Sequence, residues 1–322
     1  MPEVGIVIVT YQSEAVIADC LRAAVCTGAE VVVIDNASRD ATVQVARGLG
    51  ARVVANAENR GFAGAVNQGV QLLKTPYVLL LNPDAVLQTG IEPLTARLRQ
   101  PGVGAAGGLL LGRDGRSQRG FSVRRFPTPA ALIFEILLVN RAWPSNPVNW
   151  QYRCSNVSLE AARPVDQPAG AFLMFSRQAW QQIGAFDEGF YPVWFEDVDF
   201  CRRLRCAGFS IWLEPAARAV HDGGHAVQSL SFEQSRVYWY GGLVRYAARH
   251  FRPLSYRLVC AALVLGSLIR FVGELLQHRT FSTSAVYGRV AGMAARSFRN
   301  SRHAGSMECG DPDMGILRKR KG

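Results

Sequence analysis

Short apolar runs alternate with segments of helical periodicity over residues 4–84. The apolar runs predict strands at Val4–Val9, Glu30–Ile34, Arg52–Ala55 and Tyr77–Leu81. The segments between them predict helices over Glu14–Val25, from an N-cap at Ser38 through Gly48, and from about Gly61 to Lys74. Buried strands that alternate with helices predict an α/β fold with a doubly wound, mainly parallel sheet.

The alternation weakens between Pro101 and Pro168, which we interpret as a lid or an acceptor-side insertion. Within this section the pattern predicts a strand at Val103–Gly112, an apolar segment at Ala130–Val139 that is too short to cross a bilayer, and a loop at Trp143–Trp150. Regular elements then return. They are predicted at Gly170–Phe175 (strand), Arg177–Ile183 (helix) and Ala217–Val220 (strand).

The stretch Phe190–Phe209 combines aromatic side chains with two adjacent carboxylates, Glu196 and Asp197. A helix is predicted to begin at these acids, and a strand to follow at Phe209–Pro215. Acidic residues in a first helical turn are explained by the helix dipole alone. Two carboxylates beside Trp194 also suit a general base that removes a proton from a sugar hydroxyl. Both interpretations stay open on this stretch by itself.

The last hundred or so residues differ in character, because helical patterns there carry many arginines. Ser231–His250 is predicted to be helical, and Leu258–Leu276 to form an amphipathic helix that lies on a membrane surface or packs on the preceding lobe. Arg270 and Glu274 interrupt the second segment and leave an apolar part below the length of a span. We therefore expect a helical, membrane-associated extension over residues 226–297 and a basic, disordered tail over 298–322.

Charge and cysteine content narrow the partners and the compartment. The 322 residues are 49% hydrophobic, and 36 Lys and Arg against 25 Asp and Glu give a net charge of +11. Because the excess is heaviest near the C-terminus, it favours nucleotides and an anionic membrane surface over sequence-specific binding of nucleic acid. The seven cysteines form no CxxC pair, and no signal-peptide pattern precedes the first strand. These features predict a cytoplasmic protein that is peripheral on the inner face of the membrane.

Polar side chains gather where the predicted strands end, at Thr10, Tyr11, Asp35, Asn36, Asn59, Asn82 and Asp84. Open α/β sheets bind ligands beyond the carboxyl ends of their strands, so this clustering predicts a site. Neither GxGxxG after the first strand nor GxxxxGK[ST] is present, which argues against a dinucleotide-dependent dehydrogenase and a P-loop phosphotransferase. A bound diphosphate would then be held by a metal ion and side chains.

These segments together resemble the inverting, family 2 glycosyltransferases of the GT-A fold, and most closely their rhamnosyltransferase-like branch. The resemblance rests on IVIVTYQ, VVVIDNASRDAT, NRGFAGAVNQG, LLLNPDA, GAFLMFSRQAW, IGAFDEGF, FEDVDFCRRLRCAGF and HDGG, in this order. It implies a catalytic domain over residues 1–225, with a nucleotide-sugar half at about 1–110 and an acceptor half at about 111–225. The implied reaction moves rhamnose or a similar sugar from a nucleotide-diphosphate sugar to a glycan or lipid-linked acceptor in surface polysaccharide biosynthesis.

The resemblance also implies a role for each matching residue. Thr10, Tyr11, Asp35 and Asn36 would hold the nucleoside, and Asn59, Gly61 and Asn67 would shape the wall near the ribose and diphosphate. Asp84 would bind Mg²⁺ or Mn²⁺, with His221 as a further ligand, although a histidine at a strand end is more often structural. Asn82 replaces the first aspartate of the family's Asp-x-Asp motif and would contact the donor with less negative charge. Asp197 would be the catalytic base, Glu196 its acidic neighbour, and Trp194 and Arg203 contacts to the acceptor.

Three other functions remain to be compared with this one. A glycoside hydrolase would use two carboxylates and water, whereas an inverting transferase needs one strong base. A nucleotidyltransferase would need a Gly-rich, Arg-containing loop after the first strand, which TYQSEAV does not provide. A non-catalytic scaffold would suit the weakened metal motif at Asn82, but Asp84, Asp197 and His221 argue against it.

Overall fold

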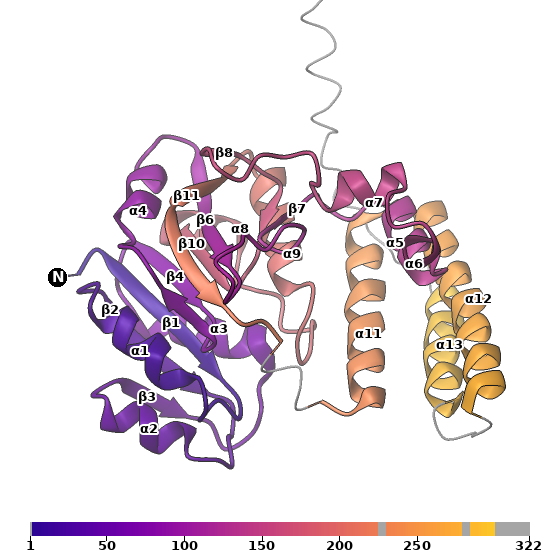
Figure 1. Ribbon diagram of the computed structural model, residues 1–322, viewed down its shortest axis with the longest axis horizontal. Helices are drawn as coiled ribbons and strands as arrows, with labels where there is room; N and C mark the ends of the chain where they lie inside the picture. Colours follow the sequence, from indigo (N-terminus) through magenta and orange to yellow (C-terminus); the bar gives the residue numbers. More distant parts are fainter. Residues whose placement is uncertain (1, 225–229, 279–283, 300–322) are drawn as a thin grey trace, which may run out of the picture.

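The computed structural model describes residues 2–224, 230–278 and 284–299. Within them, an α/β lobe is built on a nine-stranded sheet, and a group of helices lies at the side of that lobe (Figure 1). In spatial order the strands are β3 (Arg52–Ala55), β2 (Glu30–Asp35), β1 (Val4–Thr10), β4 (Tyr77–Leu81), β10 (Phe172–Ser176), β6 (Val103–Leu111), β11 (Ser210–His221) and β5 (Ala85–Leu87), and β8 (Arg163–Pro164) pairs with β11. Two further short strands, β7 (Val123–Arg124) and β9 (Gln167–Pro168), pair with each other.

The predicted α/β class and the parallel arrangement of the first four predicted strands are confirmed. Strands β1 to β4 pair in parallel, and their register aligns Thr10 with Asp35. Strand β10 is antiparallel to both of its neighbours, while β11 runs parallel to β6. Strand β5 is antiparallel to β11 and pairs Ala85 with His221. Asp84, which precedes Ala85, is therefore brought beside His221 at one end of the sheet.

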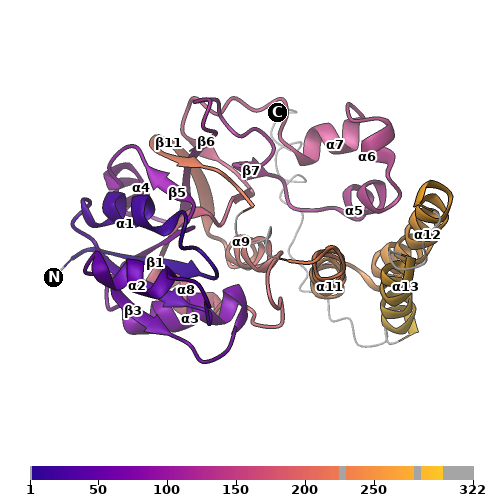
Figure 2. The ribbon, with the colours of Figure 1, turned by 60° about the horizontal axis from the view of Figure 1, so that its bottom comes forward.

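Helices cover both faces of the sheet (Figure 2). Successive side chains of a strand point to opposite faces, so each strand contributes to a core on either side of the sheet. On one face Ile6 and Ile8 join the core beneath α1 (Ile17–Val25), α2 (Thr42–Gly48) and α4 (Glu92–Leu98). On the other face Val7 joins the core beneath α3 (Gly61–Leu72), α8 (Arg177–Ile183) and α9 (Glu196–Cys206). A doubly wound sheet with two cores is the result.

Three local predictions were wrong, each for an identifiable reason. Ser38 does not cap α2, because its hydroxyl bonds Asp35 Oδ1 at 2.5 Å, and the helix begins at Thr42. The predicted strands Phe209–Pro215 and Ala217–Val220 are one strand, β11, with an irregularity between Glu214 and Arg218 that accommodates Pro215. The predicted loop Trp143–Trp150 contains the start of a helix.

That helix, α7 (Pro147–Tyr152), has the local signals of a helix start. Asn146 precedes it and accepts a hydrogen bond from the Asn149 amide at 2.9 Å, and proline at the first helical position needs no amide partner. We had interpreted its prolines as loop residues without weighing the asparagine in front of them. Proline after a capping residue indicates a helix start as readily as a loop.

The remaining helices are α5 (Pro129–Ile136), α6 (Val139–Ala142), α11 (Phe232–His250), α12 (Pro253–His278) and α13 (Ser284–Arg299). Their core is shared with the lobe, because Phe190 and Phe195 pack among Tyr240, Leu243 and Tyr246 of α11. Helix α11 therefore contacts the stretch that carries the predicted catalytic carboxylates. The division of the chain at residue 225 stays a prediction, and residues 300–322 of the predicted tail lie outside the described residues.

Helix α12 corrects one step of the sequence argument. By length and composition, Pro253–Leu276 is a helix that could cross a membrane, and only 33% of its apolar 18-residue stretch is buried in the protein. Arg270, which interrupts the apolar run in the sequence, turns inward and bonds the carbonyl oxygens of Ile136 and Gly266. The outward face carries Arg257 near the start of the helix and the apolar side chains of Leu254, Leu258, Leu265, Leu268, Ile269, Val272 and Leu276. Length alone therefore does not distinguish a spanning helix from one that lies on the membrane surface.

Candidate active site

A cavity of about 700 Å³ lies between the strand ends, the loop before α9 and the helices α5 and α11. Its wall contains Thr10, Tyr11, Asn36, Asn59, Asn82, Asp84, Trp194, Glu196, Asp197 and His221. Most of the predicted site residues are thus brought to one place, although they come from segments distant in the sequence. A second hollow, of about 960 Å³ between α11 and α13, contains none of them.

The nucleoside side of the cavity is built from the ends of β1 and β2. Asp35 is buried behind this wall, where its carboxylate accepts hydrogen bonds from the Thr10 hydroxyl at 2.8 Å and from the backbone amide of Ser38 at 2.9 Å. Asn36 donates to the Gly61 carbonyl at 3.1 Å and accepts from the Asn56 side chain at 3.2 Å. Asp35 therefore positions the strand ends, while Thr10 and Asn36 face the cavity.

Two other predicted donor contacts do not line the cavity. The Asn67 side chain is buried and bonds the amide and carbonyl of Phe186, each at 2.9 Å, so it anchors the loop after α8. Gly61 has a φ of +75°, and a Cβ there would lie 2.9 Å from the Tyr191 ring. Only glycine allows the Tyr191 loop to close against α3. Both residues shape the site through this loop instead of contacting a ligand.

At the far strand ends, Asp84 and His221 face each other. His221 Nε2 lies 3.5 Å from Asp84 Oδ1, and both residues are buried. The pairing of β5 with β11 produces this contact, because it sets His221 opposite Ala85. The Nε2 atom is buried and has no hydrogen-bond partner, which is unusual for a polar atom in a protein interior.

Gln118, which the sequence argument did not include, determines the tautomer of His221. Its Nε2 donates to the His221 carbonyl at 2.6 Å, so its Oε1 must be the atom that lies 3.2 Å from His221 Nδ1. An oxygen that only accepts requires a proton on Nδ1, so in the neutral imidazole the lone pair of Nε2 is directed at Asp84. The Phe121 ring stacks on the imidazole at a centroid distance of 5.2 Å and holds its plane.

This arrangement fits a divalent cation. A carboxylate oxygen and an imidazole nitrogen, both common metal ligands, face each other, and the Gln118 side chain orients the imidazole. No cluster of three or more His, Cys, Asp or Glu that could hold a metal is found in the described ranges. A cation here would need further oxygen ligands, such as the phosphates of a bound nucleotide, and Mg²⁺ commonly binds in that way.

Helix α9, which carries the predicted catalytic carboxylates, begins with an unusual turn. Trp194 and Phe195 both have positive φ, 83° and 74°, a conformation that side chains larger than glycine rarely adopt. Helix α11 supports the turn, because a Cβ at Gly242 would lie 2.8 Å from the Trp194 carbonyl oxygen. The turn sets Glu196 and Asp197 in the first helical turn beside the cavity.

Asp197 is held by backbone amides. Its Oδ2 accepts from the Gly170 amide at 3.0 Å and its Oδ1 from the Val198 amide at 2.8 Å. Burial raises the pKa of Asp197 above its usual range, and these two hydrogen bonds act against the rise. A Cβ at Gly170 would lie 2.9 Å from Oδ2, so the close approach of that amide requires glycine. The result is a fixed carboxylate of increased basicity.

Glu196 differs from its neighbour. It is buried, its Oε2 has no hydrogen-bond partner, and the pKa of its carboxyl group is raised well above the usual range, first by burial and then by the charge of Asp197. Both effects favour the protonated form of Glu196. Of the two carboxylates, Asp197 is therefore the one more readily ionised and so available to accept a proton.

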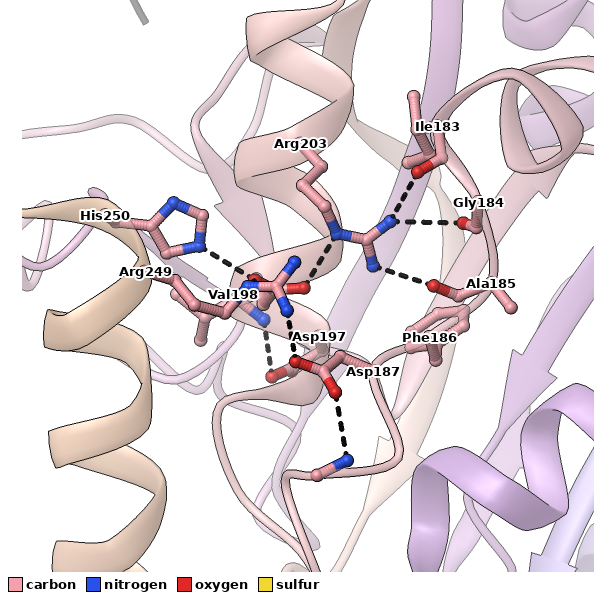
Figure 3. A network of polar contacts seen from close by, with 12 residues as sticks. Ile183, Gly184, Ala185, Phe186, Asp187, Asp197, Val198, Arg203, Arg249 and His250 are labelled. Carbon is pink, nitrogen blue, oxygen red and sulfur yellow. Dashed lines mark hydrogen bonds and ion pairs between the residues drawn. The ribbon is translucent and has the colours of Figure 1, made fainter. Parts of the chain in front are cut away.

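Arg203 does not line the cavity, contrary to our prediction that it contacts the acceptor. Its guanidinium is buried, pairs with Asp199 at 2.8 Å and donates to the carbonyls of Ile183, Gly184 and Ala185 (Figure 3). Every side of the guanidinium is occupied, so the arginine links α9 to the loop after α8.

The same cluster joins α9 to α11. Asp199 also accepts from His250 at 2.8 Å, and Arg249 connects it to Asp187 (Figure 3). Burial raises the pKa of Asp199, but the His250 hydrogen bond and the Arg203 charge outweigh that effect and hold it below its usual range. The Asp199–His250 hydrogen bond and the ion pairs of Arg249 thus link α9 to α11.

Several wall residues were missed by the sequence argument. Arg124 lies near enough to Asp197 for its charge to lower the pKa of that carboxyl, and it belongs to a basic segment visible in the sequence. Glu135, Arg236, Tyr240 and Arg270 come from helices that we had assigned to an insertion or to the extension. Arginines among aromatic residues on a predicted helix were the available signal for Arg236.

Comparisons with known proteins agree with this geometry. The model of the family described as Glycosyl transferase family 2 matches residues 5–159. Over 211 residues the chain is 31% identical to the N-acetylglucosaminyl-diphospho-decaprenol L-rhamnosyltransferase of Mycobacterium tuberculosis, which covers 61% of this chain and 67% of that protein. It is 29% identical over 184 residues to the rhamnosyltransferase WbbL of Escherichia coli, covering 56% of this chain and 64% of the relative.

A solved structure supports the same fold. The mannosyltransferase PcManGT from Pyrobaculum calidifontis, in complex with GDP-Man and Mn²⁺, superimposes with a TM-score of 0.51. The superposition covers 94% of this chain and 88% of the mannosyltransferase, at 18% sequence identity. At that identity the likeness concerns the fold, and the chemistry of the site has to be argued from its own residues.

Proposed function

The chain belongs to glycosyl transferase family 2 and is a rhamnosyltransferase-like hexosyltransferase of polysaccharide biosynthesis, and from this premise we propose that it moves rhamnose from a nucleotide-diphosphate sugar to a lipid-linked diphosphate acceptor. The names of the two bacterial relatives motivate the sugar, and that of the mycobacterial one the acceptor. One observation carries the proposal: Asp197 and the Asp84–His221 pair line the same cavity. Transfer needs a base for the acceptor and charge neutralisation at the leaving group.

In the proposed reaction, the acceptor hydroxyl oxygen forms a bond to the anomeric carbon as the bond from that carbon to the diphosphate breaks. Asp197 takes the hydroxyl proton, and the nucleoside diphosphate leaves with the electron pair. A single displacement inverts the anomeric carbon and forms no glycosyl-enzyme intermediate, so one ionised carboxylate suffices. Mg²⁺ or Mn²⁺, when bound by Asp84 and His221, supplies positive charge to the leaving diphosphate.

The other side chains of the cavity have supporting parts in this proposal. Thr10, Tyr11 and Asn36 hold the nucleoside, Asn59 and Asn82 lie along the path of the diphosphate, and Trp194 contacts the acceptor. Glu196, whose raised pKa favours its neutral form, stays beside Asp197, where a second negative charge would make the first carboxylate harder to ionise.

A thermal-shift screen of donors tests the proposal. With Mn²⁺, dTDP-rhamnose is expected to raise the melting temperature more than UDP-GlcNAc or GDP-mannose, because at a hundred times its Kd a ligand stabilises the fold by about 2.7 kcal/mol. The same screen with EDTA is the control and should show a smaller rise. A larger rise with another donor would mean that the enzyme transfers the sugar of that donor instead of rhamnose. Pyrophosphate release from a nucleoside triphosphate and a sugar 1-phosphate would favour the nucleotidyltransferase instead.

We propose that the enzyme works in the cytoplasm as a peripheral protein of the membrane. The exposed apolar face of α12 and the exposed Arg252 and Arg257 at its start support this placement. Each basic residue near an anionic surface contributes about 1 kcal/mol, so the attraction is salt-dependent. High salt or carbonate is expected to release the enzyme from isolated membranes. Release only by detergent would mean that α12 spans the bilayer.

A further inference from the structure

The cavity continues past Asp197 into a second half whose wall is made by helices outside the α/β lobe. Helix α5 contributes Leu132 and Glu135, α11 contributes Arg236 and Trp239, and α12 contributes Arg270. A donor held at the strand ends leaves this half for the acceptor, and Asp197 lines the same cavity. The side chains of this wall therefore indicate which kind of acceptor can bind there.

The charge of this second half is dominated by two arginines. Arg270 donates to the carbonyls of Gly266 and Ile136, and Arg236 lies over the Phe232 ring at 5.1 Å. Neither guanidinium forms an ion pair with a carboxylate among residues 2–224, 230–278 and 284–299. Glu135, the acid on this side, is bonded to the Asn140 side chain at 2.8 Å. The positive charges of two arginines from different helices are thus available to bind an anion.

The two arginines flank Tyr240 on the cavity wall. Arg236 and Tyr240 are four residues apart on α11 and so lie on the same face of that helix. The Arg270 guanidinium lies 5.8 Å from the Tyr240 ring. Arg236 and Arg270 therefore border the same part of the cavity and can act on one group bound beside Tyr240. Guanidinium pairs are well suited to the several oxygens of a phosphate group.

Helix α12 connects this anion site with the membrane-facing surface. Arg270 projects toward the cavity, while Leu268, Ile269 and Val272 of the same turns are exposed on the outside. A helix with its side chains is about 10 Å across, so the anion site and the apolar face are separated by one helix diameter. That separation suits a ligand with a charged head and an apolar chain.

We propose that Arg236 and Arg270 bind the diphosphate of the lipid-linked acceptor, with its sugar directed toward Asp197 and its lipid chain leaving along the outer face of α12. The inference rests on the proposed function, because it takes the acceptor class from there. It adds a second diphosphate site, formed by arginines, to the metal-dependent one at Asp84. The helical extension is then part of the acceptor site as well as a membrane contact.

Binding of farnesyl diphosphate to the full chain in EDTA tests the site, since the donor's diphosphate site lacks its metal under these conditions. Calorimetry is expected to show binding by the parent. Arg236→Gln and Arg270→Gln are each expected to weaken it about tenfold to a hundredfold, the loss typical of a charge-assisted contact. Arg22→Gln, on α1 and remote from the cavity, is the matched control and should bind like the parent.

Three further ligands separate the possible sources of binding. Farnesyl monophosphate should bind more weakly than the diphosphate, and farnesol should bind weakly to all variants alike. Inorganic pyrophosphate should show the same dependence on Arg236 and Arg270 at lower affinity. Equal binding of farnesol and farnesyl diphosphate would overturn the proposal, as would variants that bind the diphosphate like the parent.

The variants also have to be distinguished from folding defects and from a failure of the proposed function. Arg270 donates to carbonyl oxygens of α5, so Arg270→Gln could destabilise the fold, and its melting curve is measured as well. Exposed Arg236 has no such bond, so the binding result for Arg236→Gln tests the site if Arg270→Gln unfolds. Titration with Mn²⁺ and dTDP on the same variants should be unchanged. Lost farnesyl diphosphate binding with retained nucleotide binding supports the arginine site. Retained binding of both removes the arginine site and leaves the proposed transferase intact.

Discussion

Asp197→Asn is expected to fold and to bind donor and metal, but to transfer sugar about 10²–10⁴ times more slowly, the loss typical of a missing general base. The asparagine oxygen can still accept the Gly170 amide, which lies 3.0 Å from Oδ2 in the parent, while the Val198 amide loses its side-chain acceptor at a cost of about 1 kcal/mol, which a melting curve measures. What is lost is the ability to take the acceptor's proton. Because burial raises the pKa of Asp197, the parent carboxylate is a stronger base than an exposed aspartate.

Glu196→Gln is the matched control for this prediction. Burial and the charge of Asp197 raise the pKa of Glu196 well above its usual range and so favour its protonated form, which a neutral amide resembles. We expect a mild effect on the rate. Single-turnover transfer at saturating donor separates chemistry from binding. If Asp197→Asn stays within about threefold of the parent while Glu196→Gln does not, the base is Glu196.

The pH dependence of the parent follows from the same shift. Asp197 must be ionised to act, so transfer should fall as the pH drops through its raised pKa. The acid side of the profile is then expected above the range of an ordinary aspartate. An acid limb at or below that range would contradict the role of this carboxylate.

Asp84→Ala is expected to abolish metal-dependent donor binding. Asp84 is the only carboxylate of the NPD motif, and its Oδ1 atom lies 3.5 Å from His221 Nε2. Titration of Mn²⁺ in the presence of dTDP measures the effect. Asn82→Asp should keep or tighten binding, because it restores a second carboxylate. Asp19→Ala, an exposed acid on α1, is the control. Unchanged binding by Asp84→Ala would remove Asp84 from the metal site.

The same titration tests the part played by Gln118. Gln118→Leu removes the acceptor that holds the proton on His221 Nδ1, and changes to such outer partners typically weaken metal binding 10–100-fold. The expected loss is about tenfold, smaller than for Asp84→Ala. Equal affinities for Gln118→Leu and the parent would mean that the imidazole keeps its orientation through Phe121 alone.

The sequence by itself determined the class of the fold and the chemistry of the site. Runs such as Val4–Val9 are buried on both faces and could only be central strands, so the parallel half of the sheet followed from periodicity. Because the carboxyl ends of parallel strands share one edge, the polar residues after them had to meet, and Thr10, Asn36 and Asp84 line one cavity. The motifs around Asp197 predicted it to be the base, and the structure puts it in the wall of this cavity.

The tertiary structure alone decided which polar residues face the cavity. Polar side chains such as Asn67, Arg203 and Asp35 are of the types that commonly bind ligands. In this protein their hydrogen-bond partners are other protein groups, which only the packing of distant segments shows. The same holds for Gln118, whose partner is His221, and for Arg270, whose helix reaches the cavity from the extension. Local sequence pattern encodes periodicity and turns. It does not encode which side chains from distant segments satisfy one another, because that depends on how the elements pack.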